Sequence, residues 1–359
     1  EGVTWYGWET MSDSTTTYQL WAWGGNNAGV SGQNNLTAYS SPVQVTGETW
    51  TSVINWTDNQ SNGNAAALKS DGTLWVWGGN ATGCLGLNEQ GSPSMKSSPV
   101  QLPGTTWSSG DGGRDSMSMI KTDGTLWSWG NNEQGGLGQN NTTNYSSPVQ
   151  VGSDTTWSKI ARGARASFGI KTDGTLWAWG RNAAGQLGDT TVTQRSSPVQ
   201  IPGTTWGNVE NYRVLALASK TDGTLWTWGL NEFGGLGQND RTSRSSPVQI
   251  PGTTWTNTIS AGYNGGAAIK TDGTLWSWGY NGDGQLGINE QGSGNRRSSP
   301  VQMPGTTWSK IYMGMSRGAA IKTDGTLWVW GNNYKGQLGV NTHATKYSSP
   351  TQIPGTNWN

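Results

Sequence analysis

The segment Lys-Thr-Asp-Gly-Thr-Leu-Trp, read at Lys171 to Trp177, decides the fold because it recurs along the chain. Further copies start at Lys121, Lys220, Lys270 and Lys322. The Leu-Trp-x-Trp pattern at its end occurs seven times, at intervals of 49 to 54 residues, with its first Trp at Trp21, Trp75, Trp127, Trp177, Trp226, Trp276 and Trp328. A period near 50, with strand patterns and turn signals inside each unit, predicts an all-β propeller in which each repeat is one small sheet.

The fourth repeat shows how one unit should fold. Asp173-Gly174 predicts a tight hairpin turn, since Asp-Gly tolerates the positive φ of such turns. Trp177 and Trp179 should share one face because side chains alternate along a strand. Four antiparallel strands are predicted in this unit, at about 157–161, 166–172, 176–179 and 198–201.

Strand parity assigns the connections to two faces of the disc. The loops between strands one and two, and between strands three and four, should lie together on one face. The Asp-Gly turns and the Pro-Gly-Thr-Thr links between units should lie on the other. Differences in length between repeats are concentrated in the first set, which includes the long stretches Leu87 to Ser97 and Ile288 to Ser298.

A Trp opens each unit and marks the predicted boundaries. We expect one seven-bladed domain of four-stranded antiparallel blades over residues 1–359, with repeats at roughly 5–49, 50–106, 107–156, 157–205, 206–254, 255–307 and 308–359. Trp358 is an eighth boundary Trp for seven repeats. The two ends of the chain should therefore meet, or the chain should continue past Asn359. Because Glu1 is not a start methionine, we expect a processed product, an excised fragment or part of a longer chain.

Composition excludes several classes of function. Charged residues make up only 12%, and 24 Trp against two Phe indicate a core built from tryptophan. The 22 basic and 22 acidic side chains balance, so the chain has no net charge that would attract it to nucleic acid or to an anionic membrane. One His and one Cys support neither a nucleophilic triad nor a zinc site. We therefore expect no catalytic residue, no cofactor and no metal.

At this point the chain resembles the regulator of chromosome condensation repeat family, which forms seven-bladed propellers. The resemblance rests on the pattern DGxLWxWGxNxxGQLG. It is seen at Asp173 to Gly188, Asp272 to Gly287 and Asp324 to Gly339, and in relaxed form at Asp71 to Gly86, Asp123 to Gly138 and Asp222 to Gly237. It covers essentially the whole chain.

Most repeated residues have a structural interpretation. The Trp pairs look like sugar-binding platforms in isolation, but packing between neighbouring blades demands the same repetition and is favoured. The Asp of each turn, such as Asp173, is a turn residue first, because calcium would need several converging oxygen ligands. Cys84 replaces the Gln of the Gly-rich loop and is expected to be a packed small residue.

The candidate binding residues lie on the variable face. Trp56 belongs to no repeated Trp place and sits in an insertion. The loops between strands one and two add Arg114, Arg162, Arg165, Tyr212, Arg213, Tyr263, Asn264, Met315 and Arg317. Arg and Tyr are favoured at interfaces. Alternatively, the arginines could pair with acids in the same loops, namely Asp58, Asp111, Asp115 and Glu210.

These observations favour a non-enzymatic protein-binding, adhesion or display module, with another protein or a surface glycan as partner, no membrane insertion and no nucleic acid. Low charge and high Asn, Ser, Thr and Gly content suggest an extracellular, cell-surface or virion location. Resemblance to the propeller-type β-lactamase inhibitor implies a second function, a secreted enzyme inhibitor. The founding members of the family imply a third, guanine-nucleotide exchange or chromatin binding.

Overall fold

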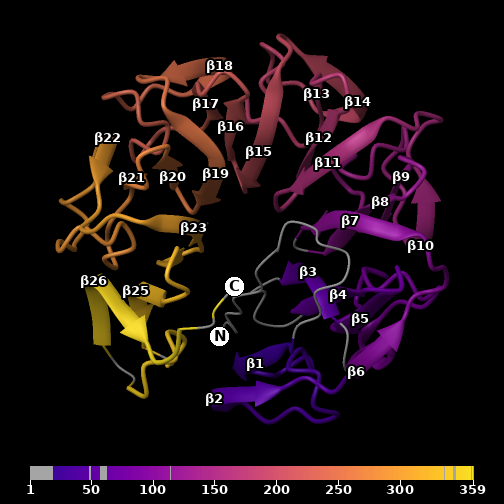
Figure 1. Ribbon diagram of the computed structural model, residues 1–359. Helices are drawn as coiled ribbons and strands as arrows, with labels where there is room; N and C mark the ends of the chain where they lie inside the picture. Colours follow the sequence, from indigo (N-terminus) through magenta and orange to yellow (C-terminus); the bar gives the residue numbers. More distant parts are fainter. Residues whose placement is uncertain are drawn as a thin grey trace.

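In the computed structural model, antiparallel sheets surround a central axis and form an all-β propeller (Figure 1). The structure describes residues 19–47, 50–56, 63–113, 115–334, 336–342, 345–356 and 358. Within them are six four-stranded sheets and one two-stranded sheet. In each four-stranded sheet the first strand lies nearest the centre and the fourth lies at the rim (Figure 1).

The sheets follow the order of the sequence repeats, and we number the four-stranded ones as blades two to seven. The two-stranded first sheet pairs β1 (Trp21–Gly24) with β2 (Tyr39–Gln44). Blades two to four are β3 (Trp50–Trp56), β4 (Asn64–Lys69), β5 (Leu74–Gly78), β6 (Lys96–Gln101); β7 (Trp107–Gly112), β8 (Ser116–Lys121), β9 (Leu126–Gly130), β10 (Tyr145–Gln150); and β11 (Trp157–Arg162), β12 (Ala166–Lys171), β13 (Leu176–Gly180), β14 (Arg195–Ile201). Blades five to seven are β15 (Trp206–Tyr212), β16 (Leu215–Lys220), β17 (Leu225–Gly229), β18 (Arg244–Ile250); β19 (Trp255–Gly262), β20 (Gly265–Lys270), β21 (Leu275–Gly279), β22 (Arg297–Gln302); and β23 (Trp308–Met313), β24 (Arg317–Lys322), β25 (Leu327–Asn333), β26 (Thr345–Ile353). One 3₁₀ turn, η1 (Ser92–Ser94), lies in blade two.

Blade four confirms the predicted meander and corrects one strand start. The strands pair in the order β11-β12-β13-β14. The fourth strand begins at Arg195, three residues before the predicted start at Pro198. Pro198 is accommodated because β14 is the rim strand and the pairing is irregular between Ala178 and Gly180, so no ladder bond from its nitrogen is needed.

The second Trp of each pair connects neighbouring blades. Six of these rings are completely buried. Each donates its indole N–H, at 2.8 to 2.9 Å, to a carbonyl in the Gly-rich loop of the preceding repeat: Trp77 to Val30, Trp129 to Cys84, Trp179 to Gly136, Trp228 to Gln186, Trp278 to Gly235 and Trp330 to Gln285. The expected core role is therefore confirmed for the second Trp of each of these six pairs. It is too strong for the first Trp, which is 40% exposed at Trp21 and only half-buried in blades two to seven, because there it lies against the first-strand Trp and the Lys of its own blade, as Trp177 does in blade four.

Glycine allows this close approach. Gly188 has φ +77°, and a Cβ added there would lie 2.7 Å from the indole nitrogen of Trp228. Next to it, the Thr190 N–H donates to the Ser245 carbonyl of blade five at 2.8 Å. The Gly-rich loop is thus the surface on which the next blade packs.

The ring closes through apolar packing. One buried cluster contains Ala22 of the first sheet, Val45 just after it, Ala67 of blade two, and Leu327 and Leu338 of blade seven. Residues from near both ends of the chain are therefore packed together, as a closed propeller requires.

Candidate functional site

The Asp-Gly turns form a uniform face whose polar groups are engaged in the fold. In blade four, Asp173 Oδ1 accepts the N–H of Thr175 at 2.9 Å and its hydroxyl at 2.7 Å. The Thr175 Oγ1 in turn accepts the indole N–H of Trp177 at 3.0 Å. Lys171 places its ammonium 4.1 Å from the ring centre of Trp177 and 5.0 Å from that of Trp157. The KTDGTLW motif is therefore a staple between three strands of one blade.

The same staple recurs in blades two to seven. The hydrogen bonds from Thr, then from its backbone N–H, lower the pKa of Asp71, Asp123, Asp173, Asp222, Asp272 and Asp324. These carboxylates are turn residues, which confirms the structural interpretation. Among the residues that the structure describes, no group of three or more His, Cys, Asp or Glu is placed to hold a metal ion.

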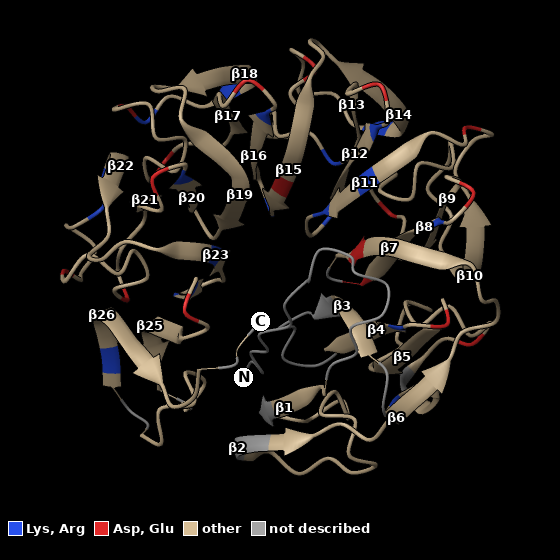
Figure 2. Ribbon diagram, viewed as in Figure 1, with Lys and Arg blue, Asp and Glu red and all other residues tan. Residues whose placement is uncertain are grey.

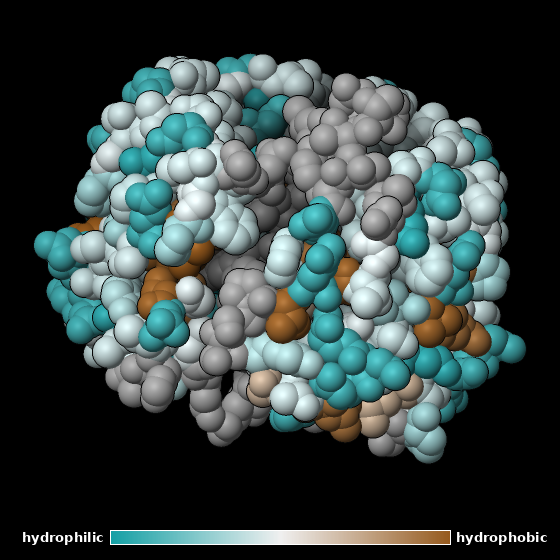
Figure 3. Space-filling view, turned by 60° about the horizontal axis from the view of Figure 1, so that its bottom comes forward, coloured by the Kyte–Doolittle hydropathy of each residue, from teal (hydrophilic) through white to brown (hydrophobic). Residues whose placement is uncertain are grey.

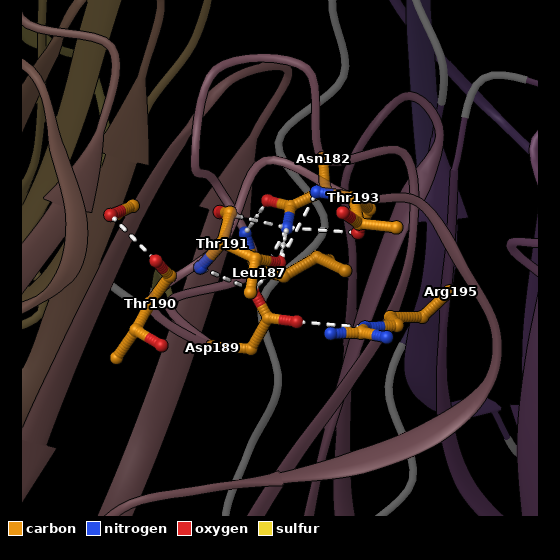
Figure 4. A network of polar contacts seen from close by, with 8 residues as sticks. Asn182, Leu187, Asp189, Thr190, Thr191, Thr193 and Arg195 are labelled. Atoms are coloured by element: carbon orange, nitrogen blue, oxygen red, sulfur yellow. Dashed lines mark hydrogen bonds and ion pairs between the residues drawn. The ribbon is translucent and has the colours of Figure 1, made fainter.

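A buried Asn organises each loop between strands three and four. In blade four, Asn182 accepts the N–H of Leu187 at 2.9 Å and donates to Asp189 Oδ1 at 2.9 Å (Figure 4). Asp189 also faces Arg195, whose Nε lies 2.8 Å from Oδ2. Burial opposes ionisation of Asp189, but hydrogen bonds from Thr191, Arg195 and Asn182 outweigh it and lower its pKa. This Asn explains the invariant N of the repeat motif.

The single cysteine has the packed role that its position predicted. Cys84 is buried, and its Sγ lies 3.2 Å from both the Asn64 amide nitrogen and the Gly79 carbonyl. Burial raises the pKa of the Cys84 thiol to about 12. The thiol is therefore a poor nucleophile at neutral pH.

Arg162 is buried between blades three and four. Its guanidinium donates to the hydroxyls of Ser116 and Ser118 at 2.6 and 2.7 Å and to the Gly136 carbonyl at 2.9 Å. Its backbone N–H donates to Asp111 at 2.7 Å. Burial lowers the pKa of Arg162 to about 10, while the charge of Asp111 opposes this shift. Arg162 is thus a buried structural residue, held mainly by hydroxyls and a carbonyl, with Asp111 bonded to its backbone rather than to its guanidinium.

The other predicted binding residues differ in how far they are buried. Arg317 is only 5% exposed at the start of β24, and Tyr212 is half-buried against the core of blades five and six. Arg165 is half-buried in the loop after β11. Arg114 and the side chain of Trp56 lie outside the described residues, as does Asp58.

The remaining candidates gather on the loop face of blades five to seven. Arg213 is exposed, and its guanidinium carbon lies 5.2 Å from the ring centre of Tyr263. The Tyr263 N–H donates to the Gly314 carbonyl of blade seven at 3.3 Å, next to Met315, which is 45% exposed. Asn264 adopts φ +57° and closes the same loop.

Loops between strands three and four extend this surface. The rings of Phe233 and Tyr280 meet edge to face with centres 5.3 Å apart, and Arg296 lies 5.6 Å from the centre of Phe233. Lys346 donates to the Gly282 carbonyl at 3.3 Å and lies 5.5 Å from the ring centre of Tyr334, which is 51% exposed. We call the set Arg213, Phe233, Tyr263, Tyr280, Arg296 and Tyr334 the aromatic–arginine arc.

The sequence analysis did not identify four members of the arc as candidate binding residues. These four are Phe233, Tyr280, Arg296 and Tyr334. They lie in loops between strands three and four, which the sequence analysis compared between repeats by length and not by residue type. A signal was present, because aromatic residues replace polar ones in WGLNEFGG, WGYNGDG and WGNNYKG, and Phe233 is one of only two Phe.

Figures 2 and 3 show how charged and hydrophobic residues are distributed over the described part of the chain. Acidic and basic residues are spread around the ring without a sector of one sign (Figure 2). On the face shown in Figure 3, hydrophobic residues form small groups separated by hydrophilic ones. Among the described residues, no helix has the length and apolar character needed to cross a membrane.

Comparison with known proteins agrees with this architecture. The family model "Regulator of chromosome condensation (RCC1) repeat" matches residues 123–170, 173–212, 222–269, 272–316 and 324–358, which is more than half of the chain. A second model of the same repeat matches 157–186, 257–285 and 308–337. The chain therefore belongs to the RCC1 repeat family.

Solved structures show the same fold at low sequence identity. A chain of the complex between Kap60 and yeast RCC1 (Prp20) superposes with a TM-score of 0.79 at 19% identity, covering 94% of this chain and 83% of that one. Prp20p from Saccharomyces cerevisiae gives 0.78 at 19%, covering 94% and 86%. Human WBSCR16 gives 0.78 at 21%, covering 94% of both chains.

Proposed function

We propose that this propeller is a non-catalytic protein-binding module that uses the loop face of blades five to seven. The aromatic–arginine arc is the observation that carries the proposal. It brings aromatic rings and guanidinium groups that are at least partly exposed from three blades onto the same loop face, and such side chains dominate the energetics of protein interfaces. The repeated residues, in contrast, are engaged in blade structure.

Related structures support a binding role. Yeast RCC1 (Prp20) was solved bound to Kap60, and Prp20p was studied for its binding to Gsp1p and histones. These partners belong to those proteins, and no partner is transferred from them. The adhesion, display, inhibitor and exchange alternatives, and an extracellular or virion location, stay predictions.

We also propose that β1 and β2 are the third and fourth strands of blade one, which brings the number of blades to seven. Their register, Trp21 with Gln44 and Ala22 with Val43, repeats that of β13 and β14, Trp177 with Gln200 and Ala178 with Val199. An experimental structure with six or eight blades would overturn this count.

Site-specific photo-crosslinking tests the binding face. We would place benzoylphenylalanine at Tyr334 of the arc and, as a matched control, at Thr172, which is exposed on the uniform face. The proposal expects one identified partner to crosslink from Tyr334 and not from Thr172, with loss of that product when Arg213 and Arg296 are both replaced by Gln. Crosslinking only from Thr172 would show that the uniform face is the working one.

A further inference from the structure

We propose that the aromatic–arginine arc binds an acidic polypeptide segment, with Arg213 and Arg296 holding its Asp or Glu carboxylates. This inference rests on the proposed function and names the chemistry of the partner. It comes from a contrast between two kinds of basic residue on the same face.

Basic residues at the start of the rim strands already have acidic partners. Arg195 pairs with Asp189 at 2.8 Å, Arg244 with Asp240 at 2.7 Å, and Lys96 with Glu89 at 2.9 Å. Arg297 likewise pairs with Glu290. Their charge is neutralised within the fold, so they add little attraction for a partner.

Arg213 and Arg296 differ, because within the described part of the chain neither guanidinium has an acidic partner. Each lies over an aromatic ring instead, Tyr263 for Arg213 and Phe233 for Arg296. Stacking restricts the side chain and leaves the N–H groups at the guanidinium edge free, apart from the bond from Arg296 Nε to the Ser293 carbonyl at 3.1 Å. A restricted guanidinium loses less entropy when it binds, and its fork geometry matches a carboxylate.

Neighbouring residues favour an acidic polypeptide over a nucleic acid as the partner. Glu232 is exposed beside Phe233, and Asp283 lies 2.7 Å from Lys346. The Glu232 carboxylate would repel the closely spaced charges of a nucleic acid, Asp283 already neutralises Lys346, and the chain has no net positive charge to offset this. A polypeptide can space its carboxylates apart and place apolar side chains against Tyr334 and Met315, which are about half exposed.

The test uses a displayed library of random linear peptides, selected on the whole chain. The proposal expects enriched peptides to combine Asp or Glu with apolar residues. For a synthetic enriched peptide, fluorescence anisotropy should show affinity falling about tenfold or more in the Arg213→Gln/Arg296→Gln variant, since charge-assisted bonds are lost. Arg241→Gln is the control substitution. Arg241 is exposed on a loop of blade five, to which Arg213 also belongs, and it lies over no aromatic ring of the described residues. This substitution should change the affinity less than about twofold.

Additional variants and controls distinguish recognition of a carboxylate by Arg from simple charge attraction and from loss of folding. The Arg213→Lys/Arg296→Lys variant keeps the charge but not the fork, so it should bind less well than the wild type. Unchanged melting temperatures would show that the variants are folded. Selected peptides without acidic bias, no enrichment at all, equal loss in the Arg241 control, or tighter binding of oligothymidylate would each overturn the inference. A partner that crosslinks from Tyr334 through a segment lacking acids would overturn it while leaving the proposed function intact.

Discussion

Replacing Trp179 and Trp228 with Phe, one at a time, should destabilise the propeller by different amounts. Both rings are completely buried, and both donate to a Gly-rich-loop carbonyl at 2.9 Å. The acceptors differ. Gly136 O also accepts from Arg162 and from the hydroxyl of Ser167 at 2.8 Å, whereas in the described structure Gln186 O has Trp228 as its one donor.

The magnitudes follow from this difference. In both variants the smaller ring and the lost bond should cost about 2 kcal/mol of unfolding free energy. In Trp179→Phe the carbonyl keeps two donors, so little is added. In Trp228→Phe a buried carbonyl loses its donor, which adds about 1 to 3 kcal/mol.

Urea unfolding followed by far-ultraviolet circular dichroism measures both values, since fluorescence would change with the removed indole itself. We expect the midpoint of Trp228→Phe to lie clearly below that of Trp179→Phe. Equal midpoints, or the reverse order, would refute the view that this N–H is the specific bond between a blade and the preceding loop.

Three further predictions concern the loops and turns. Gly188→Ala should cost about 2 to 4 kcal/mol in urea unfolding, since it strains a φ of +77° and crowds Trp228, whereas Gly294→Ala, with open space around it, should change stability by less than about 0.5 kcal/mol. Asp189→Asn should cost about 1 to 3 kcal/mol because this carboxylate is 3% exposed and paired, while Asp240→Asn, at 39% exposure, should cost less than about 1 kcal/mol; similar midpoints for the two would contradict the role of burial. The lowered pKa of Asp173 means that its folded-state advantage is present above the ordinary carboxyl value of 3.8 and is lost as the pH falls through the folded value, so Thr175→Val, which removes the main hydrogen bond, should reduce the acid-induced drop in melting temperature.

Much of the fold could be predicted because local chemistry repeats. Asp-Gly specifies the hairpin between β12 and β13, period-two spacing puts Trp177 and Trp179 on one face, and both rings pack against Trp157 with centres 6.5 and 5.9 Å away. The start of β14 was missed because the irregular pairing that accommodates Pro198 depends on its place at the rim, which no local pattern reveals.

The candidate site was predicted only in part. The sequence alone determined the repeat, the strand order within a blade and the face on which irregular loops meet, because turn chemistry, alternation and parity are local or combinatorial. It named Arg213 and Tyr263 as candidates, and these two residues meet across blades five and six. It treated Arg162 as an equivalent candidate, although the two arginines end in opposite environments.

Only the tertiary structure decided between them. Arg162 enters the interface between blades three and four, where its two terminal guanidinium nitrogens donate to two Ser hydroxyls and a carbonyl, while Arg213 follows the end of β15 and remains exposed over Tyr263. Likewise, Phe233 and Tyr280 are 47 residues apart, and only the packing of blade six against the loop of blade five brings their rings together. Burial and contacts between repeats depend on how neighbouring blades are placed, and the sequence of a single repeat does not contain that information.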